Sequence, residues 1–275
     1  MAVTSIASAL RSAAAHLAEA SDTPRLDAEM LMAKAMGVTR DTLLLSLLDG
    51  ETPEAFGSLV ARRRAGEPVA YITGRRAFWT IELEVGPGAL IPRPDSETLI
   101  EAAAAHFDAA GPARILDLGA GPGTLLLAAL DQWPNASGIG VDRSEQALAY
   151  ARANAQRLGL SGRASFRAGD WAEGIAQRFD LILCNPPYVE VAAALPCDVA
   201  EWEPHEALFA GADGLDDYRR LAPALGGLIA PGGIASVEIG SAQAAAVMAL
   251  FIAAGLKAQV RHDLGGRARC LILEG

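Results

Sequence analysis

The sequence of 275 residues predicts a doubly wound α/β domain that follows a small helical domain. Apolar segments typical of buried strands alternate with helical segments from Ala113 onward, which indicates a mainly parallel sheet. The last two strand segments are joined only by "DLGGR". This link is too short for a helical crossover and predicts an antiparallel pair at one edge. The first 66 residues carry only helix signals.

The N-terminal region is divided into short helices by caps, prolines and glycines. An amphipathic helix is expected in the first twenty residues, which lack the pattern of a secretory signal; a transit peptide is the alternative. Thr23 and Pro24 supply a cap and a first-turn proline before "RLDAEMLMAKAM", which Gly37 ends. Further helices are expected after Thr39 and Thr52.

The stretch "VAYITGRRAFWTIELEV" alternates apolar and polar residues as two strands that turn around Gly74. We therefore expect a helical domain at residues 1–68, a hairpin and linker at 69–92, and the α/β domain at 93–275.

Seven strands and their helices are expected in the α/β domain. The strands are "ARILDLG", "SGIGVD", "ASFRAGD", "FDLILCN", "GIASVEIG", "KAQVRH" and "ARCLILE". The helices are expected from about Pro122, over Ser144–Arg157, near Asp216–Leu228 and over Ala242–Ala254.

The composition restricts the partners and the compartment. A net charge of −10 argues against direct binding to nucleic acid, which normally requires an excess of Lys and Arg. Three cysteines without a C-x-x-C pair and four scattered histidines predict neither a disulfide framework nor a metal site. No apolar stretch approaches the ~18 residues of a membrane span. We expect a cytoplasmic protein, and a monomer.

A glycine loop is the first candidate site. Gly119, Ala120, Gly121, Pro122 and Gly123 follow an apolar strand and open a helix. Glycines at such a turn let a ligand approach bare backbone at the helix N-terminus. The spacing is G-x-G-x-G, and a purely structural turn is the alternative.

Two acidic positions follow at the ends of the next strands. Asp142 is placed to accept hydrogen bonds from both ribose hydroxyls of an adenosine; alternatively, it only caps the next helix. Asp170 and Trp171 are candidates for the adenine edge of the same site. The alternative, compatible with that role, is a D-x-x-E helix cap with Trp171 packing locally.

The stretch "FDLILCNPPYV" ends a core strand in Asn185, Pro186, Pro187 and Tyr188. Proline lacks a backbone N–H and holds the preceding residue extended. This edge therefore offers two fixed acceptors, the Asn185 side-chain oxygen and the Pro186 carbonyl. A turn without a catalytic role is the alternative.

Two fixed acceptors suit a planar –NH2 group. If both of its hydrogens are held, its nitrogen lone pair can be turned out of conjugation toward an electrophile. Tyr188 would flank the group and exclude water. No activated Ser, Cys or His is needed, because an alkylated amide loses its proton readily. Asn185, Pro186 and Tyr188 are therefore the candidate catalytic residues, and together with Pro187 they form the candidate substrate site.

These residues resemble a known family. "NPPY" with "DLGAGPG" and the closing antiparallel pair resembles the class I S-adenosylmethionine-dependent N-methyltransferases. Further stretches, from about Asp27 to the end of the chain, closely resemble the HemK/PrmC-type release-factor glutamine methyltransferases. They are "GEPVAYITGRRAFW", "LIPRPDSETLIE", "EPHEALFAGADGLDDYRRL", "EIGSAQ" and "DLGGRAR".

The resemblance implies methyl transfer from S-adenosylmethionine, with S-adenosylhomocysteine as product, to the glutamine nitrogen of the Gly-Gly-Gln loop of class 1 release factors. It implies that the helical domain recognises the substrate. It places the methionine part of the cofactor at Gly119–Gly123, its ribose at Asp142 and its adenine at Asp170 and Trp171. Asn185 would lie near both cofactor and glutamine.

The sequence departs from this family pattern at Pro122, where Ser or Thr is usual, at Ser96, where Thr is usual, and in "FAGADG". Another glutamine substrate, such as a ribosomal protein, and adenine N6-methylation of nucleic acid remain open. A dehydrogenase would explain the glycine loop but not the acceptor edge, and a non-catalytic binding module is the least favoured alternative.

Basic residues cluster at Arg62–Arg64 and at Arg75–Arg76 in an otherwise acidic chain. Three consecutive arginines on a helix fan over about 200°, so they do not all face a core. A solvated face is expected for the first cluster, and contact with a release factor is the alternative.

Overall fold

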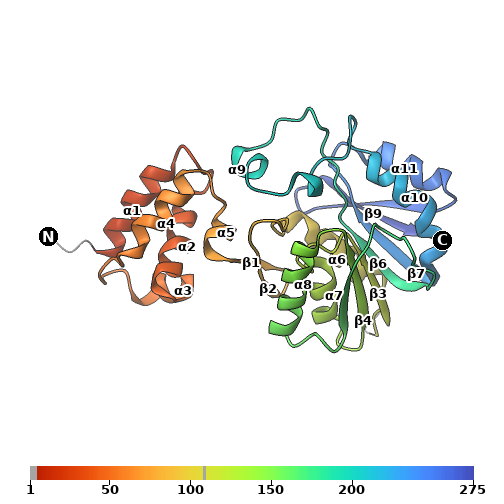
Figure 1. The fold of residues 1–275 in the computed structure, drawn as a ribbon, viewed down its shortest axis with the longest axis horizontal. Coiled ribbons are helices and arrows are strands. Elements are labelled where there is room, and N and C mark those ends of the chain that lie inside the picture. The colour runs from red at the N-terminus through yellow and green to blue at the C-terminus, as the bar shows by residue number, and fades with distance from the viewer. Residues whose placement is uncertain (1–4, 108–109) are drawn as a thin grey trace. The chain divides into compact units, whose positions relative to one another are not determined.

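The structure, a computed structural model, describes residues 5–107 and 110–275. Residues 1–4 of the predicted helical domain and residues 108–109 of the predicted α/β domain lie outside the described residues. The chain divides into two compact units (Figure 1). One consists of Met1–Arg75 with Leu195–Trp202, and the other of Arg76–Ala194 with Glu203–Gly275. The second crossing of the chain, at Leu195–Trp202, has no signal in the sequence.

The helical unit has one apolar core, formed by its helices between Ile6 and Thr73. Ile6, Leu10, Leu31 and Met32 are fully buried in that core. Gly37 adopts a left-handed conformation (φ 68°) and ends the second helix, as predicted. The helices are α1 (Ile6–Leu17), α2 (Pro24–Met36), α3 (Arg40–Ser46), α4 (Ala55–Arg64), α5 (Val69–Thr73) and α9 (Cys197–Ala200).

Thr23 does not cap α2 through its side chain. Its hydroxyl donates instead to Asp27 Oδ1 at 3.3 Å, while Thr39 caps α3 as predicted by accepting from Thr42 N at 3.1 Å. Asp27 offers a charged acceptor one turn along, and a hydrogen bond to a carboxylate is stronger than one to a neutral group, so the Thr23 hydroxyl donates there.

The predicted hairpin is only partly correct. Val69–Thr73 forms the short helix α5, and the two strands are β1 (Arg75–Phe78) and β2 (Ile81–Glu84). Gly74 (φ 76°) ends α5, and the hairpin turns at Trp79, which has a φ of 54°. Five residues are too few for their pattern to distinguish one helical turn from a strand, and the packing of Ile72 in the helical core favours the helix.

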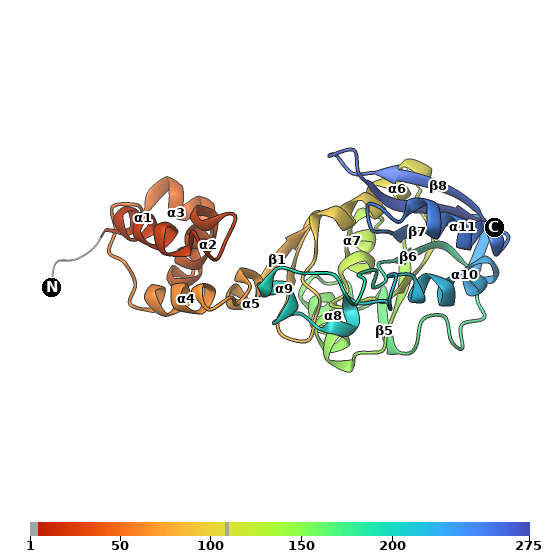
Figure 2. The same cartoon turned by 90° about the horizontal axis from the view of Figure 1, so that it is seen from above.

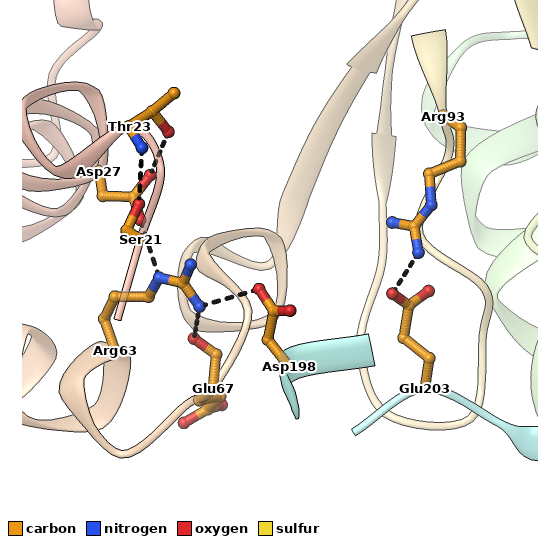
Figure 3. A network of polar contacts seen from close by, with 8 residues as sticks. All are labelled: Ser21, Thr23, Asp27, Arg63, Glu67, Arg93, Asp198 and Glu203. Carbon is orange, nitrogen blue, oxygen red and sulfur yellow. Dashed lines mark hydrogen bonds and ion pairs between the residues drawn. The ribbon is translucent and has the colours of Figure 1, made fainter. Parts of the chain in front are cut away.

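The arginine cluster on α4 is not a uniformly solvated face, contrary to our expectation. Arg63 is 6% exposed, and its guanidinium donates to Asp27 Oδ2 at 2.8 Å and to Asp198 Oδ2 at 3.3 Å (Figure 3). Arg62 pairs with Glu67, and Arg64 is exposed. A buried arginine between two carboxylates ties the Asp198 segment to the helical unit, so Arg63 has a structural role.

The second unit contains a seven-stranded sheet in the order β5-β4-β3-β6-β7-β9-β8. Strands β3 to β7 are parallel, whereas β9 runs antiparallel to both β7 and β8, which confirms the predicted closing pair. The strands are β3 (Arg114–Leu118), β4 (Ser137–Asp142), β5 (Ala164–Ala168), β6 (Phe179–Cys184), β7 (Ile229–Glu238), β8 (Lys257–His262) and β9 (Ala268–Glu274).

Helices cover both faces of this sheet (Figure 2). Helices α6, α7 and α8 pack on one face, and α10 and α11 on the other. Central strands covered on both faces are nearly continuous apolar runs, which is why β6 was readable from the sequence. The bounds are η1 (Pro94–Ser96), α6 (Glu97–His106), α7 (Thr124–Gln132), α8 (Glu145–Arg157), η2 (His205–Ala207), α10 (Asp216–Leu228) and α11 (Ala244–Ala253).

Candidate active site

A pocket lies beyond the carboxyl ends of the parallel strands. Strands β3 and β6 are neighbours, so Gly119 and Asn185, which follow them, meet at one edge of the sheet. All of the predicted cofactor residues except Gly123 line this pocket. Of the other predicted substrate residues, Pro187 lines the pocket, whereas Pro186 and Tyr188 do not. The lining members are Gly119, Ala120, Gly121, Pro122, Asp142, Asp170, Trp171 and Asn185.

The glycine loop presents bare backbone to the pocket. Gly119 and Gly121 have φ values of 74° and 52°, in the region that residues with a side chain rarely adopt. A Cβ atom at Gly119 would lie 3.1 Å from the Trp171 ring and 3.7 Å from the Asn185 carbonyl oxygen. Any side chain at this position would therefore crowd the pocket between these two residues.

Asp142 holds the glycine loop in place. Its Oδ2 accepts from Gly121 N at 2.8 Å, and its Oδ1 accepts from Ser144 N at 2.8 Å. The side-chain cap of α8 is supplied by Ser144, which accepts from Ala147 N. Each carboxylate oxygen can accept a second hydrogen bond, so Asp142 retains capacity for two hydroxyl donors.

Trp171 closes one wall of the pocket in a strained backbone conformation. Its φ is 47°, and its indole Nε1 donates to Asp217 Oδ1 at 3.0 Å. Asp170 forms an ion pair with Arg220, and this contact raises the pKa of Arg220. The predicted D-x-x-E cap is absent, since no helix begins in the described stretch 170–178.

The Asn-Pro-Pro-Tyr edge is held by side chains from distant segments. Asn185 Nδ2 donates to Ser96 Oγ at 3.1 Å, which leaves Asn185 Oδ1 as the acceptor. The Tyr188 hydroxyl donates to Glu238 Oε1 at 3.3 Å, and the Tyr188 carbonyl accepts from Gln243 Nε2 at 3.0 Å. The edge is therefore fixed at both ends.

Two buried carboxyl groups lie at this end of the sheet. Burial raises the pKa of Asp117, which accepts from Leu126 N at 3.0 Å, to about 7. Burial also raises the pKa of Glu238 to about 7. Burial raises the pKa of Tyr188 well above its ordinary value, so its hydroxyl stays protonated as a donor at neutral pH.

Several residues of this site carry no functional signal of their own in the sequence. Arg93 and Ser96 line the pocket. Glu203 holds the segment that precedes Ser96, because it pairs with Arg93 (Figure 3) and accepts from Ile91 N at 3.0 Å. They lie in stretches that carried the family resemblance, Arg93 and Ser96 in "LIPRPDSETLIE" and Glu203 at the start of "EPHEALFAGADGLDDYRRL". Nothing in their spacing indicated which side chain faces a pocket.

Asn154 joins the hairpin to the glycine loop. It is fully buried, its Oδ1 accepts from Glu84 N, and its Nδ2 donates to the carbonyls of Glu84 and Pro122, both at 3.0 Å. We expect Asn154→Ala to lower the free energy of unfolding by about 2–4 kcal/mol, since it leaves buried backbone groups unpaired. Denaturant unfolding checks this, with Gln156→Ala, which removes an exposed amide side chain from the same helix, as control. A loss of less than about 1 kcal/mol would contradict this role.

Among the described residues, no group of three or more His, Cys, Asp or Glu side chains is arranged to hold a metal ion. In the same part of the chain, no helix is long and apolar enough to span a membrane.

The sheet and its pocket define a class I methyltransferase. A methyltransferase domain model matches residues 111–210. A methyltransferase from Pyrococcus furiosus superposes with a TM-score of 0.53 at 18% identity, covering 78% of this chain and 95% of that one. A ribosomal protein L11 methylase from Lactobacillus delbrueckii gives a TM-score of 0.51 at 18% identity, covering 70% and 84%. These structures establish the fold.

The family follows from closer relatives. The model of the PrmC N-terminal domain matches residues 8–74. The release factor glutamine methyltransferase of Rhodospirillum rubrum is 44% identical over 257 residues, covering 91% of this chain and 79% of its own length. That of Cereibacter sphaeroides is 44% identical over 270 residues, covering 96% of each chain. The chain belongs to the release factor glutamine methyltransferase family, which confirms the resemblance seen in the sequence.

Proposed function

We propose that the protein transfers a methyl group from S-adenosylmethionine to the side-chain nitrogen (N5) of the glutamine in the Gly-Gly-Gln motif of class 1 peptide chain release factors. The observation that carries this proposal is the edge at Asn185. Its amide nitrogen donates to Ser96, so its oxygen is left as an acceptor for an –NH2 group in the lining of the pocket.

The pocket suits S-adenosylmethionine. The bare backbone at Gly119 and Gly121 would accommodate the methionine part, and Asp142 would accept from the ribose hydroxyls. Trp171 and Asp170 would border the adenine. Pro122 contributes no N–H to this loop, but its carbonyl is fixed by Asn154, so the loop keeps its shape without the usual Ser or Thr.

The bound cofactor supplies a methyl group on a positively charged sulfur, and S-adenosylhomocysteine leaves after transfer. Asn185 Oδ1 and the Pro186 carbonyl would each accept one N–H of the glutamine amide, so that its lone pair points at the methyl carbon. Tyr188 and Pro187 would flank the amide and exclude water. The methylated nitrogen then loses one proton to water, because an alkylated amide is strongly acidic.

The partner would be recognised mainly outside the pocket. We assign substrate recognition to the helical domain, residues 1–68. Residues 69–92 form the hairpin and linker that connect this domain to the α/β domain. Transfer itself is assigned to residues 93–275. Arg64 is exposed on α4 and remains a candidate contact, whereas Arg63 is committed to Asp27 and Asp198. We further propose that the enzyme acts as a monomer in the cytoplasm, without direct contact to nucleic acid.

Labelled S-adenosylmethionine tests the proposal. Incubated with the protein and a class 1 release factor, it is expected to place one methyl group on the Gly-Gly-Gln glutamine, as mapped by mass spectrometry. A release factor with alanine in place of that glutamine should stay unlabelled. Label on a ribosomal protein alone, or on adenine in nucleic acid, would contradict the proposed substrate.

A further inference from the structure

A chain of hydrogen bonds runs from Asn185 through Ser96, which also lines the pocket, to Glu238, which does not. Asn185 Nδ2 donates to Ser96 Oγ at 3.1 Å, and Ser96 Oγ donates to Glu238 Oε2. The other oxygen of Glu238 accepts from the Tyr188 hydroxyl. Ser96 and Glu238 are 2% and 1% exposed, so water does not replace these contacts. Both ends of the Asn-Pro-Pro-Tyr edge therefore depend on one carboxyl group.

We propose that Glu238, acting through Ser96, is a positioning residue that fixes which end of the Asn185 amide faces the substrate. This inference rests on the proposed function, because the orientation matters only if Asn185 receives an –NH2 group.

The physical reason lies in the symmetry of the amide. The oxygen and nitrogen of an asparagine side chain have nearly the same shape, and the torsion that exchanges them has two broad minima. A flipped Asn185 would point Nδ2 at the glutamine –NH2, donor against donor, and one of the two acceptors would be lost. The protein therefore needs a device that selects one orientation.

Ser96 and Glu238 form such a device. An ionised carboxylate has no hydrogen to donate, so the single hydroxyl hydrogen of Ser96 must point at Glu238. The Ser96 oxygen then offers only lone pairs to Asn185, and only Nδ2 can face it. The charge on Glu238 thus fixes the direction of the Ser96 hydroxyl, and the Ser96 hydroxyl fixes the orientation of the Asn185 amide, so that Oδ1 faces the substrate.

Protonation of Glu238 would remove this control. A protonated Glu238 can donate to Ser96, whose hydrogen is then free to turn to Asn185 and stabilise the flipped amide. Burial raises the pKa of Glu238 to about 7, which brings the change into the neutral range. The other titratable or charged groups around it are Tyr188 and Cys184 from β6 and the edge that follows it, Asp95 from η1, Tyr218 from α10, and Arg269 and Cys270 from β9.

Rate–pH profiles of release-factor methylation test the proposal. For the wild type, kcat at saturating substrates is expected to fall as the pH decreases through about 7, because the inactive form is the protonated one. Glu238→Gln should lower kcat about 10²-fold, in line with the cost of a misplaced reacting group, and abolish the acid limb of the profile. The Kd for S-adenosylmethionine should change less than about threefold, since Glu238 does not line the pocket.

Two substitutions at Ser96 separate positioning from mere support of the fold. Ser96→Ala removes the hydroxyl that links Glu238 to Asn185, so it should show the same decrease in kcat and the same loss of the acid limb as Glu238→Gln. Ser96→Thr keeps the hydroxyl and should keep the wild-type kcat and the acid limb. A structural role alone would shift the midpoint of thermal unfolding in both Ser96 variants and leave the pH profile unchanged. Wild-type kcat with an unaltered acid limb in Ser96→Ala and Glu238→Gln would overturn this inference alone. Absence of methylation by the wild type at pH 8 would refute the proposed function itself, and the inference with it.

Discussion

Replacing Asn185 with alanine is expected to lower kcat for methylation of the release factor about 10³-fold, the cost of losing a preorganised polar group that acts at the reacting atoms. The side chain supplies one of the two acceptors of the proposed amide clamp. Without it the glutamine nitrogen keeps its lone pair in conjugation, and alignment with the methyl group is lost. Single-turnover rates with labelled S-adenosylmethionine measure the effect.

The same variant should bind S-adenosylmethionine with a Kd within about fivefold of the wild type, since the glycine loop and Asp142 are unchanged. Calorimetric titration supplies that value. Gln156→Ala, which removes an exposed amide side chain from α8, is the matched control and should leave both kcat and Kd unchanged. Near-normal turnover in Asn185→Ala would exclude the clamp mechanism.

The sequence alone was sufficient to predict the strands of the sheet and the residues on one side of the pocket. Apolar runs such as "FDLILC" identify central strands because both of their faces are buried. The carboxyl ends of parallel strands share one edge, so the sequence alone predicts that the loop after β3 and the Asn-Pro-Pro-Tyr edge after β6 lie together. Local chemistry and topology agreed at these positions.

The groups behind that edge could not be predicted in this way. Ser96 and Glu238 are 142 positions apart, and both meet Asn185 or Tyr188 only because η1 and β7 come together in the fold. A buried glutamate in the apolar stretch "GIASVEIG" is the one signal that was available. A carboxyl group at the end of a core strand requires hydrogen-bond partners, but the sequence does not say which.

The errors have a similar origin. A solvated face is expected for Arg62–Arg64 because three consecutive arginines fan over about 200° of a helix. Arg63 departs from this expectation, since Asp27 and Asp198 together offset the cost of removing its charge from water. One of these partners lies 135 positions away, in the segment Leu195–Trp202 that joins the helical unit. Likewise, the sequence predicts a strand where the structure has α5, because a single helical turn is too short for its period to be recognised.

Replacing Asp142 with alanine is expected to raise the Kd for S-adenosylmethionine about 100-fold, the combined cost of losing two hydrogen bonds to a charged acceptor. The variant loses the proposed ribose contacts and also the bond from Gly121 N that shapes the glycine loop. Asp180→Ala is the matched control, because Asp180 also accepts from two backbone N–H groups, those of Ala113 and Arg114, but at the opposite ends of the strands. Both variants should lose comparable stability in denaturant unfolding, and only Asp142→Ala should lose cofactor affinity in calorimetric titration. Equal Kd values for the two variants would mean that Asp142 serves the fold and that the ribose is held elsewhere.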